Sequence, residues 1–363
     1  MFVQWEVGSV VVWSGRGFIK KIGIIARCDN TGLGNQTREL VKMLNPEKIL
    51  LINSQPFNRN KQNLDWYKDY NCLITNGFAD NGEVVNFLDG IDVVISCEIF
   101  YNPDFIALAK RKNVKTILQY NYEFLDYLQN TTLQFPDVLL APSLWNFDEV
   151  SRRFGHKTKV VHLPPPTDYT IFEVSKKNNI NKNYNRLLHI AGKAAVKDRN
   201  GTNTVIEMLK YSKSDYQLVI KSQTELDISC NDPRLTVEIN NVETNSRLYD
   251  GFDAMVLPRR YAGLCLPMNE ALMASLPVFM TNISPNNQIL PESWLSESYK
   301  IDELMTRTML DVYSANPEKL AKTIDTYMDI KDKTTIKQEA FNIGFNNFSV
   351  DVLKQRYIDI IEK

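Results

Sequence analysis

The chain has 363 residues, of which 44% are hydrophobic and 23% charged, so it is long enough to form two globular domains. Its 42 Lys and Arg residues nearly balance its 43 Asp and Glu residues, and the net charge of −1 excludes a general attraction to nucleic acid or to an anionic membrane. The five cysteines are widely spaced and include no Cys-x-x-Cys pair, which favours a reducing compartment and argues against a zinc site.

Residues 1–20 are predicted to be an extension of the first domain. They contain the apolar run Val10–Trp13, which is too short to span a membrane and has no basic segment before it. No membrane span is therefore expected in this part of the chain.

The first domain is predicted to begin with a strand, a glycine loop and a helix. The buried strand Lys21–Ala26 leads into the loop 29–36, which contains Gly32 and Gly34, and the helix Thr37–Leu44 follows. Nucleotide-binding α/β domains begin in this way, but a tight turn between strand and helix also needs glycine. Because the loop lacks a third glycine and a ribose-binding acid, we reject a dinucleotide site.

Further apolar runs alternate with helical stretches through residue 163, and this alternation predicts a parallel sheet with helices on both faces over residues 21–170. The predicted strands are Lys48–Ile52, Asn71–Ile74, Val93–Cys97, Lys115–Tyr120, Val138–Ala141 and Lys159–Leu163. Asn121 and Glu123 directly follow one of them, at the edge of the sheet where α/β proteins bind ligands. Capping of the next helix explains these two residues equally well.

A second domain is predicted over residues 187–345, after the prolines Pro164–Pro166 and a polar linker at 171–186. Its first strand, Leu187–Ala191, is followed by a basic loop that contains Lys193, Lys197 and Arg199. Such a loop either binds an anion or is only solvated. Later strands are predicted at Gln217–Lys221 and Leu235–Ile239, with helices at Pro317–Met328 and Val350–Ile361.

The stretch from Leu257 to Thr281 is the most informative part of the chain. The strand Ala254–Leu257 ends at a proline, a loop with Gly263 follows, and Pro267 marks the first turn of a helix. The N-terminus of that helix suits a phosphate, and Glu270, one turn along, can reach hydroxyl groups beside it. An ordinary crossover helix with a surface glutamate is the alternative.

This stretch resembles the donor-binding signature of glycosyltransferase family 4. The family's proline-terminated strand, Gly-x-Gly-Leu-Pro-type loop and Glu-Ala helix are matched at Gly263, Leu264, Leu266, Pro267, Glu270 and Ala271. The chain departs from the family at Ala262, where the first of two glutamates usually stands. The Pro-Arg-Arg-Tyr sequence and the loop 29–36 are similar to those of glycosyltransferases from tailed phages.

The resemblance implies an α/β protein of GT-B architecture, with two Rossmann-like, doubly wound parallel-sheet domains that face a cleft. It also implies a C-terminal helix, 346–363, that packs back on the first domain. The expected activity is retaining transfer of a sugar from a nucleotide-diphosphate donor, with no cofactor besides this co-substrate. The sequence contains no Asp-x-Asp motif, so metal-independent catalysis is expected.

The resemblance assigns roles to specific residues. Lys193, with Lys197 or Arg199, would neutralise the donor diphosphate, and Glu270 would accept hydrogen bonds from the ribose; we take Glu270, Lys193 and Lys197 as the catalytic group. The remaining expected contacts are the backbone amides of Gly263, Leu264 and Cys265, the loop residues Gly34 and Asn35 near phosphate or acceptor, and Asn121 and Glu123 beside the transferred sugar.

Two other functions fit the same residues. One is a catalytically silent scaffold that binds a nucleotide sugar or a partner, and the other is a nucleotide-sugar epimerase of the same fold. The acceptor is left open between a modified DNA base, a virion protein and a glycan. The expected location is the cytoplasm, which would be the host cytoplasm for a phage protein.

Overall fold

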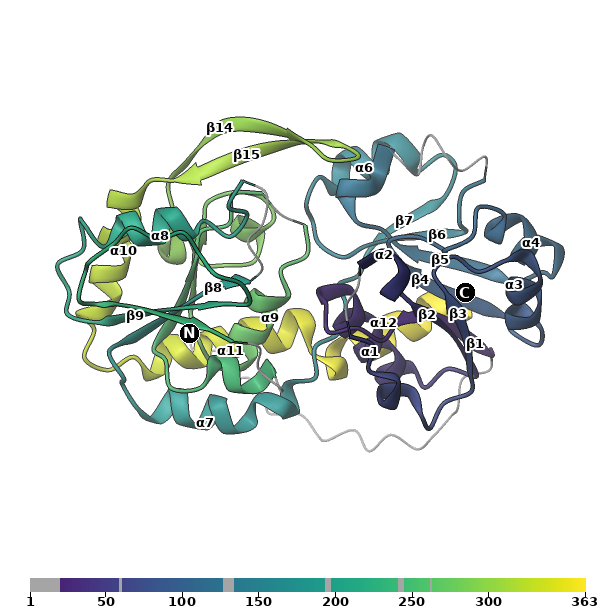
Figure 1. Cartoon of the computed structure of the whole chain (residues 1–363), viewed down its shortest axis with the longest axis horizontal. Helices are drawn as coiled ribbons and strands as arrows, with labels where there is room; N and C mark the ends of the chain where they lie inside the picture. The colour runs from purple at the N-terminus through teal and green to yellow at the C-terminus, as the bar shows by residue number, and fades with distance from the viewer. Residues whose placement is uncertain (1–19, 59–60, 127–133, 193–196, 241–244, 262) are drawn as a thin grey trace, which may run out of the picture.

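The computed structural model describes residues 20–58, 61–126, 134–192, 197–240, 245–261 and 263–363. It contains two α/β domains side by side, with the last helix returning to the first domain (Figure 1). Each domain has one parallel sheet with helices packed against it, so the predicted pair of Rossmann-like domains is confirmed.

The first domain is built on a seven-stranded sheet in the order β3-β2-β1-β4-β5-β6-β7, and every neighbouring pair is parallel. Its central strands are apolar without alternation because both faces of the sheet are buried. In β1, for example, Ile25 packs into one core and Ile24 into the core on the opposite face. The strands are β1 (Ile22–Arg27), β2 (Lys48–Asn53), β3 (Cys72–Asn76), β4 (Val93–Cys97), β5 (Lys115–Gln119), β6 (Val138–Ala141) and β7 (Lys159–His162).

Local capping fixes where several first-domain helices begin. Thr31 caps α1 by accepting a hydrogen bond from the Gly34 amide, and Asp80 and Glu83 form a reciprocal capping box at α3. The helices of this domain are α1 (Gly32–Leu44), α2 (Gln55–Asn58), α3 (Asn81–Leu88), α4 (Phe105–Arg111) and α6 (Phe147–Phe154), with short 3₁₀ turns at Leu64–Tyr67 and Tyr122–Phe124.

The second domain is built on a six-stranded parallel sheet in the order β10-β9-β8-β11-β12-β13. The strands are β8 (Arg186–Gly192), β9 (Gln217–Ser222), β10 (Leu235–Ile239), β11 (Ala254–Leu257), β12 (Val278–Thr281) and β13 (Leu295–Ser296). The helices are α7 (Glu173–Asn181), α8 (Thr202–Met208), α9 (Leu266–Met273), α10 (Pro317–Met328) and α11 (Thr334–Phe348), with 3₁₀ turns at Tyr169–Phe172, Asn245–Tyr249, Asn286–Gln288 and Glu292–Trp294.

Helix α7 lies where the sequence predicts a polar surface linker. Its sequence is mostly polar, but Asn179 is fully buried and donates hydrogen bonds to the backbone oxygens of Tyr249 (2.8 Å) and Ala274 (2.9 Å). The segment is therefore part of the second domain, because its polar side chains bond that domain's backbone.

Helix α12 (Val350–Glu362) packs on the first domain although it follows the second in the chain (Figure 1). Leu353 and Tyr357 lie in the same core as β1, and the Tyr357 hydroxyl donates to Pro164 O at 2.9 Å. The chain passes from the first domain to the second near Thr167 and returns near Phe348. These two crossings are adjacent, because the Thr167 amide donates to Phe348 O at 2.8 Å.

The antiparallel hairpin of β14 (Ser298–Met305) and β15 (Met309–Ala315) also connects the domains, and it was not predicted from the sequence. It leaves the second domain and reaches toward α6 of the first (Figure 1). Leu310 and Val312 are buried in the first-domain core, and Asp126 N donates to Thr308 Oγ1 at 3.1 Å. The hairpin thus spans the two domains on the side opposite α7.

Among the described residues, no helix is both long and apolar enough to cross a bilayer.

Candidate active site

A cavity of about 400 Å³ lies between the domains, where the two sheets face each other with their carboxyl ends. In each sheet the strand order reverses at one place, between β1 and β4 in the first and between β8 and β11 in the second. Open α/β sheets bind ligands at such a switch point. The first-domain face consists of Gly32, Leu33, Gln36, Glu98, Gln119, Tyr120, Asn121 and Pro142, and the second-domain face of Ala191, Gly192, Arg199, Asn200, Arg259 and Leu264–Pro267.

Two arginines dominate the second-domain face. Arg199 follows β8 and Arg259 follows β11, and only 5% of Arg259 is exposed. Arg259 Nη1 donates to Leu264 O at 3.0 Å. The Nε atoms of both arginines are buried and have no hydrogen-bond partner among the described residues. An unpaired buried donor is costly, so this face is suited to an anion.

Arg199 also contacts the first domain. Its guanidinium forms an ion pair with Glu123 and lies 5.1 Å from the centre of the Tyr261 ring. Burial, together with the neighbouring charge of Arg259, lowers the pKa of Arg199 to about 10. The group remains charged at neutral pH, and a second negative charge in the cavity would stabilise it further.

The loop after β11 approaches the first domain closely at Gly263. A Cβ atom at this position would lie 3.2 Å from Cε3 of Trp145 and 3.4 Å from Oδ1 of Asn121, so a larger residue would push the loop away. A Cβ at Gly32 would meet Leu266 Cδ1 at 3.8 Å. The two glycine-containing loops therefore face each other across the cavity.

Helix α9 begins at the wall of the cavity. Cys265 is its N-cap residue, and Pro267 stands in the first turn. Proline is tolerated there because an N–H at that position would have no acceptor within the helix. Leu264, Cys265, Leu266 and Pro267 all line the cavity. The partial positive charge of the helix N-terminus is therefore directed to the same space as the two arginines.

Glu270 lies one turn into α9 and does not line the cavity. The Tyr249 hydroxyl donates to its Oε2 at 2.6 Å. Burial and the adjacent Glu270 raise the pKa of Tyr249 well above its usual value, so the hydroxyl stays protonated and keeps donating. This hydrogen bond fixes the orientation of the carboxylate.

The two described cations of the basic loop, Lys197 and Arg199, lie in different environments. Lys197 forms an ion pair with Asp302 of the hairpin and donates to Glu303 O at 3.1 Å, so it lies outside the cavity that Arg199 lines. Lys193 and Ala262 lie outside the described residues.

Gly34 and Asn35 lie at the start of α1 but not on the cavity wall, which Gly32, Leu33 and Gln36 form instead. A Cβ atom at Gly34 would come within 1.9 Å of Asp29 O, so the turn itself requires glycine. Asn35 donates to Asn30 Oδ1 at 3.2 Å, within its own loop.

Glu98 is the main group that the sequence analysis missed. It follows β4 at the switch point, lines the cavity and has a left-handed backbone with φ of 65°. Asn121 Nδ2 donates to its Oε1 at 3.5 Å. Burial raises the pKa of Glu98, although the Asn121 bond and the charges of Arg27 and Arg199 act in the opposite direction. A polar residue directly after a buried strand, the signal that identified Asn121, was available for Glu98 too.

Within the described part of the chain, no group of three His, Cys, Asp or Glu residues is arranged to hold a metal ion.

No protein-family model matches the chain, and no curated protein matches it in sequence. Solved structures are similar over nearly the whole chain. Anabaena HepE in complex with UDP and glucose is 12% identical, with 94% of this chain and 99% of HepE covered and a TM-score of 0.66. A Rickettsia africae glycosyltransferase is 14% identical, with coverages of 95% and 98% and a TM-score of 0.63.

An alpha-glucosyltransferase in complex with UDP-glucose and DNA containing an abasic site is 11% identical, with coverages of 95% and 100% and a TM-score of 0.64. These proteins share the two-domain parallel-sheet architecture of this chain, which therefore has the GT-B fold. At such low identity the similarity establishes the fold, and the function is inferred from the site.

Proposed function

We propose that the chain is a glycosyltransferase that moves a sugar from a nucleotide-diphosphate donor to an acceptor hydroxyl. The observation that carries this proposal is a pair of arginines, the partly buried Arg199 and the buried Arg259, which line a cavity at the switch points of both sheets and each have an Nε without a hydrogen-bond partner among the described residues. Similar structures contain UDP or UDP-glucose, which makes a uridine nucleotide the first donor to test.

The second-domain face supplies the groups that the donor chemistry requires. As the bond from the anomeric carbon to the phosphate oxygen breaks, negative charge develops on the leaving diphosphate. Arg199, Arg259 and the N-terminus of α9 all border this space, so they can stabilise that charge once the diphosphate competes with Glu123 for Arg199. In this proposal Glu270 accepts hydrogen bonds from the ribose, and Tyr249 holds it in position.

The finer features of the proposal come from the resemblance to family 4. They are retention of the anomeric configuration, catalysis without a metal ion, action in the cytoplasm and a relationship to phage enzymes. In a retaining reaction of this type a phosphate oxygen of the leaving group takes the acceptor proton, so no protein base is assigned. Both Glu123 and Asn121 come from the first domain and would lie on the sugar side.

The direct test is to incubate the protein with a panel of nucleotide sugars and to measure released nucleoside diphosphate. Release is expected with at least one donor and should persist in excess chelator. Product analysis by NMR gives the anomeric configuration of the transferred sugar and separates transfer from epimerisation.

Binding of UDP without release from any donor would contradict catalysis and favour the scaffold alternative. Loss of activity in chelator, with recovery on adding manganese or magnesium, would contradict metal independence. Absence of calorimetric binding for every nucleoside diphosphate tested would overturn the donor site itself.

A further inference from the structure

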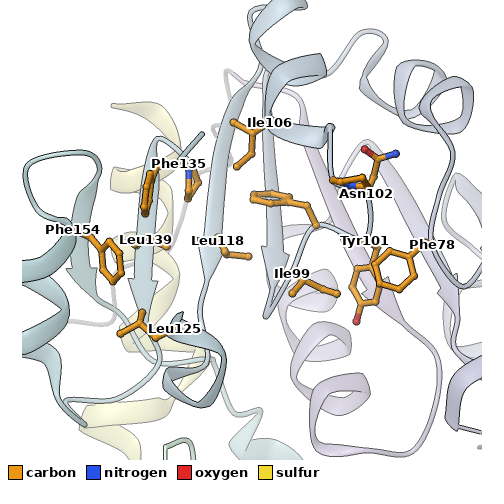
Figure 2. Close-up of a pocket in the computed structure, with 13 residues that line it drawn as sticks. Phe78, Ile99, Tyr101, Asn102, Ile106, Leu118, Leu125, Phe135, Leu139 and Phe154 are labelled. Atoms are coloured by element: carbon orange, nitrogen blue, oxygen red, sulfur yellow. The ribbon is translucent and has the colours of Figure 1, made fainter. Parts of the chain in front are cut away.

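A second, mostly apolar pocket of about 280 Å³ lies in the first domain, behind the loop that carries Glu98. Side chains from several segments that are distant in sequence, from Phe78 to Phe154, surround it (Figure 2). Its apolar lining includes Phe78, Ile99, Phe100, Ile106, Phe135 and Phe154. An engineered apolar cavity of about 150 Å³ binds benzene, so this pocket has room for one ring with a substituent.

The walls of the pocket are held by contacts among the rings themselves. Phe100 stacks on Phe105 with 4.8 Å between ring centres, and Phe135 packs on Phe154 at 5.4 Å. Phe78 forms the rim and is 58% exposed, which is unusual for so large an apolar side chain. A pocket with fixed walls and an exposed aromatic rim loses little order on binding an apolar group.

The polar side chains at the edge of the pocket are already bonded. Asn102 donates to Ala79 O at 2.9 Å and to Asn81 Oδ1 at 3.0 Å, and the Tyr101 hydroxyl is hydrogen-bonded to Arg27. A hydroxyl-rich body placed here would lose water without gaining partners. The pocket therefore selects for an apolar body.

One loop links this pocket to the active-site cavity. Glu98 lines the cavity, and the next residue, Ile99, lines the apolar pocket. Glu98 and Tyr101 both have left-handed backbones, with φ of 65° and 55°. Such conformations are unfavourable for residues other than glycine, and they are retained mainly where the surrounding structure or a function requires them. Here they direct a carboxylate to one space and apolar side chains to the other.

Glu98 is also close to the donor side. Asn121, which donates to Glu98, has its Oδ1 at 3.4 Å from the position of a Cβ on Gly263 in the donor loop. A hydroxyl that donates to Glu98 would thus lie beside the expected position of the sugar. The apolar group attached to that hydroxyl would extend past Ile99.

From this juxtaposition we infer that the acceptor is an alcohol or phenol carrying an aromatic group, with its hydroxyl bonded to Glu98 and its ring in the pocket behind Ile99. The inference rests on the proposed glycosyltransferase activity and specifies its acceptor class. Glu98 is assigned the role of orienting the hydroxyl.

A saccharide acceptor is the competing possibility, because a third opening of about 370 Å³ lies between Trp145 and the hairpin. Its carboxylates already have partners: Glu149 accepts a hydrogen bond from Tyr122 at 2.6 Å, and Asp311 is paired with Lys300 at 2.6 Å. This opening therefore offers fewer unused polar groups to a sugar than its composition suggests.

The test uses 4-nitrobenzyl alcohol as the aromatic probe and methyl glucoside as the saccharide probe, each with the donor that the protein turns over. The variants Phe78→Ser and Ile99→Asn are expected to raise KM for 4-nitrobenzyl alcohol about tenfold or more, because each removes apolar surface from the ring site. Donor hydrolysis to water and affinity for UDP should be unchanged. Ile74→Ser is the matched control, since Ile74 is a 52% exposed aliphatic residue of the same domain outside the pocket.

Saturation-transfer NMR of 4-nitrobenzyl alcohol gives a second readout that does not require turnover. Signal transfer to its ring in the native protein and in Ile74→Ser, lost in both pocket variants, supports the assignment. Absence of transfer in the native protein, equal transfer in the pocket variants, or preference for methyl glucoside as acceptor overturns it. If the proposed glycosyltransferase activity itself is wrong, the result is different: no donor is hydrolysed, even to water.

Discussion

The two faces of the cavity differ in their chemistry. The second-domain face presents two arginines and a helix N-terminus, whereas the first-domain face presents Glu98, amide side chains and a tyrosine. Positive groups stabilise a leaving diphosphate, and a carboxylate with amides orients a neutral hydroxyl. Under the proposed function, the second domain would bind the departing diphosphate and the first domain the attacking hydroxyl, with the transferred sugar between them.

The largest expected effect is on the cationic face. Arg199→Met keeps the volume of the side chain but removes its charge, and hydrogen bonds to charged groups contribute about 1.5–3 kcal/mol, which corresponds to roughly 10–150-fold in affinity. Titration calorimetry should show this loss for both UDP and inorganic diphosphate. Lys197→Ala is the control, because Lys197 pairs with the exposed Asp302 outside the cavity and should change the affinity little.

If Lys197→Ala weakened binding as much as Arg199→Met, the cationic face would be assigned to the wrong residue of the loop.

A smaller effect is expected at Glu270, which would bind the ribose and not the phosphates. Glu270→Ala should lower the affinity for UDP about tenfold, since about 1–3 kcal/mol is lost when a hydrogen-bonded partner is removed. The affinity of the Glu270→Ala variant for inorganic diphosphate should be unchanged. Tyr249→Phe, which removes only the 2.6 Å bond that orients the carboxylate, should cause a smaller loss for UDP. Equal losses for UDP and diphosphate in Glu270→Ala would place this residue at the phosphates.

Glu123 provides a test in the opposite direction. It pairs with Arg199 across the domain boundary and so occupies the guanidinium that a diphosphate would use. Glu123→Gln should therefore raise the affinity for UDP, by about threefold if the pair contributes roughly 0.7 kcal/mol, which is within the range of partly exposed ion pairs. A weaker affinity would instead show that Glu123 helps to hold the two domains together.

The smallest effect concerns stability. The raised pKa of Glu98 means that the folded protein binds its proton more tightly than the unfolded chain does. The resulting stability is present below about pH 4.3, the pKa of an unfolded glutamate, and is lost as the pH rises through the raised value. Glu98→Gln is never charged, so its melting temperature should exceed that of the native protein slightly at pH 7.

At pH 3.5 the two melting temperatures should converge, as measured by scanning calorimetry at a series of pH values. If the variant is less stable than the native protein at pH 7, the Glu98 carboxylate stabilises the first-domain face. The idea that it lowers stability and is retained for function would then be wrong.

Much of the fold was predictable because the strands of a doubly covered parallel sheet are continuous apolar runs. Val93–Cys97, Val138–Ala141 and Ala254–Leu257 were predicted with the bounds that the structure has. The hairpin was not predicted, because β14 is mostly exposed and contains no continuous apolar run.

The site was predictable where it depends on one continuous segment, as in the loop from Gly263 to Pro267 that lines the cavity. Arg259 stands in the same segment but was not singled out. Which of two adjacent arginines turns inward depends on the backbone: Arg259 bonds Leu264 O, whereas Arg260 donates to Lys197 O at 2.6 Å. Glu98 carries the same local signal as Asn121, a polar residue directly after a buried strand, but its place at the switch point follows only from the strand order, which puts β4 beside β1.

The return of α12 to the first domain has a consequence for biosynthesis. Leu353, Tyr357 and Ile361 complete the core that β1 opens, yet the ribosome adds them after the whole second domain. This core, which α1 also covers, therefore remains incomplete while the intervening segment is translated. Domains usually fold in the order in which they emerge. In this chain the first domain is synthesised first, but its core is completed only after the second domain has been synthesised.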